Sequence, residues 1–342
     1  MLAKRTFRTK LYLIGMIIAL APQIHYACTM IFWNDNTQAK VAARSTDLYV
    51  SDMPLLFVQP RGIERDGEGG ENSLKWKSKY GSVVITAFHT TTVSDGMNEH
   101  GLIAHLLYLQ KTDYGKRDEK RPALGNGLWA QYMLDNFKTV DEALAASKNL
   151  QIVSMKVHDK EWPLHLAIED AQGNSAMIEF INGEMKVYQG QQYHVLTNEP
   201  AYSIQLKNLK RYKLFGGTLP LPGDVDPLSR FVRASSFLKT LPAPKNYIEA
   251  IAGALSVMRT VMVPFGAEDT SGSKLEDSWP TRWISLADTT NRIYFFSATT
   301  APNIIWVDYK NLNFAEGAPL LALDPADPLL IGEVTRNLKK PV

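Results

Sequence analysis

The fold is decided by residues 28–50, whose sequence is CTMIFWNDNTQAKVAARSTDLYV. Residues 28–33 form an apolar run of strand-forming side chains, and residues 34–36 (NDN) follow as a turn. Residues 41–50 predict a second strand. If the two strands pair as a hairpin, they begin an antiparallel sheet whose first residue is Cys28, the single cysteine of the chain.

The segment before Cys28 has the features of a secretory signal peptide. Four cations and no acid stand within its first ten residues. An uncharged run at residues 11–22 follows, and Ala27 supplies the small residue that precedes a cleavage site. That run is shorter than the about 20 apolar residues that cross a bilayer. We therefore expect residues 1–27 to be removed on export, leaving residues 28–342 in the periplasm or outside the cell. The alternative is an uncleaved N-terminal anchor.

The mature chain carries no basic excess. The whole sequence has 37 basic and 35 acidic residues, and loss of the four leader cations leaves 33 against 35, a net charge of −2. Binding to nucleic acid or to an anionic membrane surface depends on such an excess. We therefore expect neither partner, and no stable membrane insertion after the leader is removed.

An unpaired cysteine is unusual in an exported protein, where cysteines mostly form disulfides. Such a residue makes an intermolecular bridge or serves as a reactive thiol. Removal of the leader gives Cys28 a free α-amine as well, and the reference pKa of an α-amine is near 7.7–8.0. The amine can therefore accept the thiol proton near neutral pH, as in N-terminal nucleophiles, so that no separate histidine is needed.

A second class of function is also open. A cysteine directly after a signal sequence can be the lipid-modified first residue of a bacterial lipoprotein, and the protein would then be an anchored binding or structural protein. Lipoprotein processing sites usually have a Leu-like residue three positions before the cysteine, and this chain has His25 at that position. Lipidation would block both the amine and the sulfur, so the mass of the mature N-terminus separates the two functions.

Two charged residues of the second strand are candidates for the surroundings of the thiol. A nearby cation favours a thiolate, and Arg44 lies beside the first strand if the hairpin forms; otherwise it makes a surface salt bridge. Asp47 follows three residues later, and a regular strand would point the two side chains to opposite faces. Both can face the thiol only if the strand bends at residues 45–46.

Strands and helices alternate in groups along the rest of the chain. A Gly- and charge-rich loop is expected at residues 61–73 and a turn at residues 94–101. Strands are predicted at 83–92, 102–109, 164–169, 175–181, 185–188, 194–197, 282–287, 292–299 and 304–309, and helices at 127–137, 140–148, 229–241 and 247–260. Because the strands come in hairpin groups, we expect one α+β domain of antiparallel sheets covered by helices.

Motifs for other chemistries are absent. The sequence contains no complete dinucleotide fingerprint, no phosphate-binding loop of the GxxxxGK type, no HExxH and no GxSxG. Six histidines and a single cysteine remain after the leader, without metal-ligand spacing. We expect neither a metal nor an organic cofactor.

Five distinctive segments follow one another along the chain. They are CT (28–29) with AARSTD (42–47), DGMNEHGL (95–102), LTNEP (196–200), LPGD (221–224) with SRFVRA (229–234), and TRWIS (281–285) with NRIYFF (291–296). In this order they resemble the choloylglycine hydrolase and penicillin V acylase family of N-terminal nucleophile hydrolases. The resemblance spans most of residues 28–300 and implies the family's four-layer αββα sandwich and hydrolysis of a linear amide.

The resemblance also implies roles for single residues. Cys28 would be the nucleophile and, through its amine, the general base, while Arg44 and Asp47 would tune and hold the thiol and the amine. Arg230 would lie near Cys28 and support this arrangement of charges. From the residues alone, Arg230 could simply bind solvent or a carboxylate on its helix.

Two further residues would bind the oxyanion of the tetrahedral intermediate. Asn198 would donate its side-chain amide and Tyr108 its backbone N–H, and such donors contribute roughly 10²–10³ in rate. Without the resemblance, Asn198 could be a turn asparagine and Tyr108 an ordinary strand aromatic.

The substrate stays open at this point. Tyr108 stands where penicillin V acylases of the family have Tyr and bile-salt hydrolases usually have Asn. The leader resembles the exported Gram-negative branch, which also includes acylases of N-acyl homoserine lactones. Pocket aromatics are expected among Phe32, Trp33, Tyr49 and Tyr108, although core packing explains them equally well. The segment of residues 198–230 is shorter than the corresponding segment of many relatives, in which an insertion helps to build a tetramer. A homo-oligomer is therefore left open.

Overall fold

The hairpin predicted from residues 28–50 lies at the centre of a sheet. In the computed structural model, which describes residues 27–157, 159–267 and 279–341, β1 (Ala27–Trp33) pairs antiparallel with β2 (Val41–Asp47). Cys28 lies opposite Thr46, and Met30 lies opposite Arg44. Every residue of β2 is buried, because this sheet is covered on both faces. Of the predicted leader, residues 1–27, all but Ala27 lie outside the described residues, and Ala27 begins β1.

The first sheet has seven strands. In spatial order they are β16 (Val195–Leu196), β1, β2, β17 (Thr281–Asp288), β18 (Ile293–Ala298), β19 (Ile305–Asp308) and β21 (Gly332–Glu333). Neighbours are antiparallel except β19 and β21, which are parallel.

The second sheet has eight strands, all antiparallel to their neighbours. In spatial order they are β15 (Glu184–Gln189), β14 (Ser175–Ile181), β13 (Leu164–Glu169), β8 (Ile103–Tyr108), β7 (Val93–Asn98), β6 (Ser82–Thr86), β3 (Leu55–Gln59) and β20 (Leu321–Leu323). Three small ribbons flank it: β4 (Glu64–Asp66) with β5 (Lys75–Lys77), β9 (Ala123–Gly125) with β10 (Gln151–Val153), and β11 (Lys156–Val157) with β12 (Lys160–Glu161).

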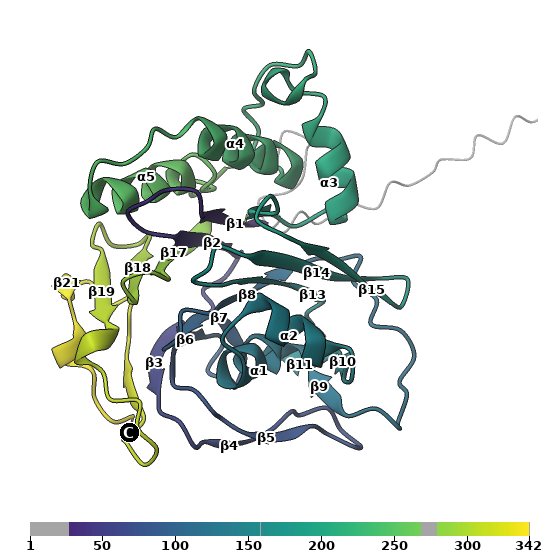
Figure 1. Ribbon diagram of the computed structural model, residues 1–342, viewed down its shortest axis with the longest axis vertical. Coiled ribbons are helices and arrows are strands. Elements are labelled where there is room, and N and C mark those ends of the chain that lie inside the picture. Colours follow the sequence, from purple (N-terminus) through teal and green to yellow (C-terminus); the bar gives the residue numbers. More distant parts are fainter. Residues whose placement is uncertain (1–26, 158, 268–278, 342) are drawn as a thin grey trace, which may run out of the picture.

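Helices cover the outer face of each sheet, so the layers run helix, sheet, sheet, helix (Figure 1). α4 (Pro227–Thr240) and α5 (Tyr247–Arg259) pack on β1 and β2, and α1 (Trp129–Asn136) packs on β7 and β8 with α2 (Val140–Ser147) beside it. A fifth helix, α3 (Tyr202–Leu209), packs on α4. The predicted α+β class with two antiparallel sheets between helices is confirmed.

Helix α4 begins where the sequence supplies a cap. The Asp226 side chain accepts a hydrogen bond from Ser229 N at 3.0 Å, and Pro227 occupies the first position of the helix. The apolar side chains of α4, among them Phe231 and Ala234, are buried in one core with the strands of the first sheet. The cap therefore fixes the start of the helix that carries Arg230.

The turn predicted at residues 94–101 is wrong, because β7 occupies most of that stretch. Its polar side chains are buried and bonded: Asn98 Nδ2 donates to the carbonyls of Leu134 at 2.9 Å and Phe137 at 2.7 Å. Gly96 is required by packing and not by a turn, since a Cβ there would lie 2.7 Å from the Val83 carbonyl oxygen. The loop predicted at residues 61–73 also contains a strand, β4.

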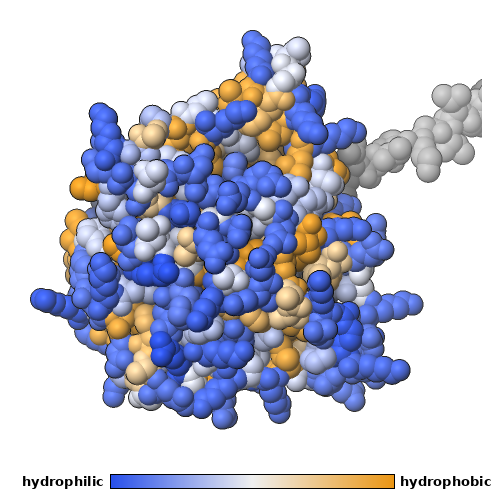
Figure 2. Space-filling model, in the orientation of Figure 1, coloured by the Kyte–Doolittle hydropathy of each residue, from blue (hydrophilic) through white to orange (hydrophobic). Residues whose placement is uncertain are grey.

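The surface is of mixed character. Hydrophilic residues cover most of the face shown in Figure 2, and hydrophobic ones are interspersed among them. Within the described residues, no helix has the length and apolarity needed to span a membrane.

Candidate active site

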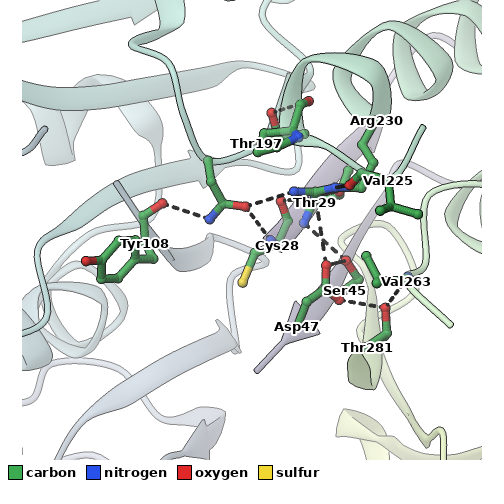
Figure 3. Close-up of polar contacts among 12 residues, drawn as sticks. Cys28, Thr29, Ser45, Asp47, Tyr108, Thr197, Val225, Arg230, Val263 and Thr281 are labelled. Atoms are coloured by element: carbon green, nitrogen blue, oxygen red, sulfur yellow. Dashed lines mark hydrogen bonds and ion pairs between the residues drawn. The ribbon is translucent and has the colours of Figure 1, made fainter. Parts of the chain in front are cut away.

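The cysteine lies near the start of β1, where the two sheets and α4 meet. Its side chain is 4% exposed. Cys28 N donates a hydrogen bond to Asn198 Oδ1, and Cys28 O accepts one from the Arg230 guanidinium at 2.7 Å (Figure 3). The same guanidinium nitrogen lies 2.6 Å from Thr29 Oγ1. Cys28 is thus held through its backbone, which leaves the sulfur to face the space beyond it.

Asn198 follows β16, the edge strand beside β1, and its side chain is fully buried. Its Oδ1 accepts from Cys28 N and also from Arg230 at 3.2 Å. Its Nδ2 donates to the backbone carbonyl of Tyr108 at 2.8 Å. The Asn198 amide therefore lies between the nucleophile's nitrogen and the end of β8.

The backbone N–H and the backbone C=O of Tyr108 point to the same side of β8. Tyr108 lies opposite Leu164 of β13, and Leu109 N donates to Pro163 O at 3.0 Å. These contacts make Tyr108 and Leu164 a non-hydrogen-bonded pair, so both the N–H and the C=O of Tyr108 point away from β13. Because the carbonyl meets Asn198 Nδ2, the Tyr108 N–H is on the Asn198 side of the strand as well.

Arg44 lies on the same face of the hairpin as the cysteine, since alternate residues of a strand share a face. It is 3% exposed, so the alternative of a surface salt bridge is wrong. Its guanidinium lies 5.5 Å from the ring of Trp283, 3.6 Å from the Asp95 carboxylate, and donates to the Ser94 carbonyl. Arg44 is therefore a fixed positive charge beneath the thiol.

Asp47 lies on the opposite face of β2, and the bend that would bring it to Arg44's face is absent. Its carboxylate accepts from Thr281 Oγ1 at 2.6 Å and from Ser45 Oγ at 3.3 Å, and lies 3.8 Å from the Arg230 guanidinium. Burial raises the pKa of the Asp47 carboxyl to about 7, against the opposing charge of Arg230. The two charged residues thus approach Cys28 from the two faces of one sheet.

The surroundings of Cys28 have two opposing effects on the pKa of its thiol. Burial raises the pKa of the Cys28 thiol, because a thiolate is poorly solvated there. The charge of Arg44 opposes this, as does a hydrogen bond from the backbone of Asp47. In the chain described here, Cys28 N is an amide because Ala27 precedes it; leader removal would turn the same atom into the α-amine.

An open cavity lies beside Cys28, which forms part of its lining. Its polar lining includes Arg44 and Asp52, but most of the wall is apolar. The rings of Phe88 and Trp162 lie 5.1 Å apart on this wall, and Tyr108 contacts Trp162 edge-on at 6.3 Å. The remaining apolar lining residues are Leu48, Ala87, Leu106, Met155, Val157 and Leu164.

Most of the aromatic residues that the sequence suggested for the pocket lie elsewhere. Only Tyr108 lines this cavity, whereas Phe32 and Trp33 line a separate hollow beneath α3 and α4. Tyr49 is 39% exposed and stacks edge-on with Trp279. Phe88 and Trp162, which the sequence did not single out, carried no motif that could have marked them.

The other five predicted site residues come together around Cys28. Arg44, Asp47, Asn198 and Arg230 surround its sulfur, nitrogen and carbonyl, and Tyr108 is joined to it through Asn198. Over the described residues, no group of three or more His, Cys, Asp or Glu side chains could hold a metal ion. What the arrangement offers is a thiol, a cation, and amide donors at the mouth of an apolar cavity.

Comparison with known proteins gives one consistent set of relatives. Residues 28–328 match the model of the linear amide C–N hydrolases, choloylglycine hydrolase family. The chain is 36% identical over 339 residues to the penicillin V acylase of Pectobacterium atrosepticum, which covers 91% of this chain and 89% of that protein. The structure of penicillin V acylase from Agrobacterium tumefaciens matches with a TM-score of 0.82 at 36% identity, over 92% of this chain and 98% of that one. A variant of the conjugated bile acid hydrolase from Clostridium perfringens shares the fold, with a TM-score of 0.74 at 22% identity over 89% of this chain and 99% of the other.

Proposed function

Because the chain belongs to the choloylglycine hydrolase family of linear amide C–N hydrolases, we propose that it is an exported acylase of the penicillin V type whose N-terminal nucleophile is Cys28. One observation carries the proposal. The family match begins at residue 28, and this residue's nitrogen and sulfur lie among a cation, a carboxylate and an amide at the end of an apolar cavity.

The proposed reaction has two steps. The α-amine of mature Cys28 takes the thiol proton, and the thiolate attacks the amide carbonyl. The C–N bond then breaks as the resulting ammonium gives its proton to the leaving amine, and a thioester remains on the sulfur. Water, activated by the same amine, attacks the thioester, releases the carboxylic acid and restores the thiol.

Asn198 and Tyr108 supply the proposed oxyanion site. Asn198 Nδ2 carries two N–H groups, and one already donates to the Tyr108 carbonyl. The other N–H and the Tyr108 backbone N–H, on the same side of β8, are the two donors that the negative oxygen needs. The Asn198 carbonyl oxygen meanwhile accepts from the nitrogen of Cys28, so one side chain orients both the base and the oxyanion.

The charged residues have separate proposed tasks. Arg44 stabilises the thiolate, since it lies on the face of the thiol and its charge opposes the effect of burial on the thiol pKa. Arg230 and Asp47 hold the Cys28 backbone and the emerging amine from the other face. All three are buried, so their charges act with little solvent screening.

The cavity favours an apolar or aromatic acyl group. Phe88, Trp162 and Met155 line it, and a phenoxyacetyl group presents an aromatic ring of matching character. We therefore place penicillin V first among substrates, in agreement with the names of two relatives that are each 36% identical to this chain. N-acyl homoserine lactones are the second candidate, because their linear amide also joins an apolar acyl chain to a polar amine.

The test is a substrate panel on the purified mature enzyme. The wild type should hydrolyse penicillin V or a long-chain N-acyl homoserine lactone, and Cys28→Ala should hydrolyse none of the panel, conjugated bile salts included. Turnover by Cys28→Ala at the wild-type rate would overturn the proposal. The mass of the mature N-terminus is measured in the same preparation, since a diacylglyceryl group on Cys28 would support the anchored binding protein instead.

A further inference from the structure

The two proposed oxyanion donors come from different sheets. Asn198 follows β16 in the first sheet, whereas Tyr108 ends β8 in the second. The described β7–β8 pairs end at Asp95 opposite His105, so β7 does not continue along the last residues of β8. The position of the Tyr108 peptide relative to Asn198 must therefore be set by other contacts.

Two hydrogen bonds join the segments at this point. Asn198 Nδ2 donates to Tyr108 O at 2.8 Å, and Gln110 N donates to the carboxylate of Glu199. Leu109 N, between them, turns the other way and donates to Pro163 O of the neighbouring chain segment. This alternation is that of an extended strand, in which residues two apart present their N–H groups to the same side. Asn198 and Glu199 thus take the place of a strand neighbour for residues 108–110.

We propose that Glu199 is a positioning residue of the oxyanion site. By accepting the Gln110 N–H, its carboxyl group fixes the end of β8 so that the Tyr108 N–H and the Asn198 amide converge on one oxygen. The inference rests on the proposed function, because it concerns the same two donors. It adds a residue to which the resemblance gave no role.

The contact has the properties that positioning requires. Glu199 is only partly exposed, and burial raises the pKa of its carboxyl to about 7. In either protonation state, one carboxyl oxygen remains an acceptor for a backbone N–H. A glutamine at this position keeps that acceptor, whereas an alanine removes it. A misplacement of about 1 Å at a reacting centre can cost about 10²-fold in rate.

The test compares Glu199→Ala and Glu199→Gln in the mature enzyme, with penicillin V as substrate. Glu184→Ala is the control, because Glu184 is a solvent-exposed glutamate on the edge strand β15. Glu199→Ala should lower kcat roughly 10-fold to 100-fold while KM stays within about 3-fold of the wild type, since the loss falls on the transition state. The kcat of Glu199→Gln should lie within about 3-fold of the wild-type value. The control Glu184→Ala should have the kcat of the wild type.

Other outcomes would overturn either the positioning role of Glu199 or the proposed function. Wild-type kcat in Glu199→Ala, an equal loss in the alanine and glutamine variants, or a change in KM alone would overturn the positioning role while leaving the proposed function standing. A wild type that turns over neither penicillin V nor the rest of the panel would overturn the proposed function, and this inference with it. A thermal melt of each variant shows whether the folded protein is being compared.

Discussion

Replacement of Asn198 by alanine is the sharpest perturbation of the proposed chemistry. The side chain supplies one of two oxyanion donors, and removal of one such donor costs roughly 10²–10³ in kcat, or about 2.7–4 kcal/mol. Since the missing oxyanion contact forms only in the transition state, kcat should fall and KM should change little. Loss of the Asn198 contact with the Cys28 nitrogen, which orients the base, should lower kcat further. The remaining Tyr108 N–H should keep the variant measurably above background.

The substitution also has a stability cost that can be estimated from the contacts. It leaves the Tyr108 carbonyl and the nitrogen of Cys28 without their partner, and Arg230 loses one acceptor. At about 1 kcal/mol for each neutral bond and about 1.5–3 kcal/mol for a bond to a charged group, the loss is roughly 3–5 kcal/mol. Most domains have 5–15 kcal/mol of stability, so the variant should remain folded at 25 °C.

The assay is steady-state hydrolysis of penicillin V at 25 °C, with urea unfolding of each protein in parallel. Asn208→Ala serves as the matched control, because Asn208 is a buried asparagine of α3 whose side chain bonds Arg211. The control should retain wild-type kcat. If folded Asn198→Ala kept more than about a tenth of the wild-type kcat, Asn198 would not be an oxyanion donor of the expected strength.

Three further predictions concern the charges and the cavity. Arg44→Met should move the pH dependence of thiol alkylation by iodoacetamide to higher pH, because the charge that favours the thiolate is lost, whereas Arg61→Met, at an exposed ion pair, should not. Burial raises the pKa of Glu169 to about 8, so its stabilising contribution is complete below about pH 4.5 and is lost as the pH rises through about 8. Glu169→Gln should therefore lose less Tm than the wild type between pH 5 and pH 9, and Glu184→Gln should behave as the wild type; equal losses in all three would contradict the assignment. Trp162→Ala should lower kcat/KM for penicillin V roughly 10-fold, from lost apolar contact, but leave an acetyl amide nearly unaffected.

The sequence predicted the elements whose patterns are local. The hairpin of β1 and β2 and the helices α4 and α5 were predicted because strand composition, turn residues and apolar periodicity lie within a few positions of one another. The strand β7 was missed because its Asp95 and Asn98 resemble turn residues. Their partners, Tyr294 and the carbonyl of Leu134, are far away in sequence, so no local pattern reports that these polar groups are satisfied.

The site was predictable to different degrees. Pairing of the first hairpin is enough to bring Arg44 beside Cys28, and strand alternation places Asp47 on the other face. Asn198 and Arg230 lie 170 and 202 residues from the cysteine, so only the family resemblance pointed to them. The lining of the cavity was not predictable, because the period of a strand distinguishes two faces without telling which element covers each.

The central claim is that Cys28 acts as a free N-terminal nucleophile, and mass spectrometry of the mature protein tests it directly. The protein should have the mass of residues 28–342. After brief mixing with penicillin V, acid quenching and digestion at acidic pH, its N-terminal peptide should carry a phenoxyacetyl group on Cys28, because acid keeps the α-amine protonated and prevents transfer of the acyl group from the sulfur to that amine. A chain that still contains residues before Cys28, a lipid on that residue, or turnover of penicillin V with the acyl group on another residue would contradict the claim.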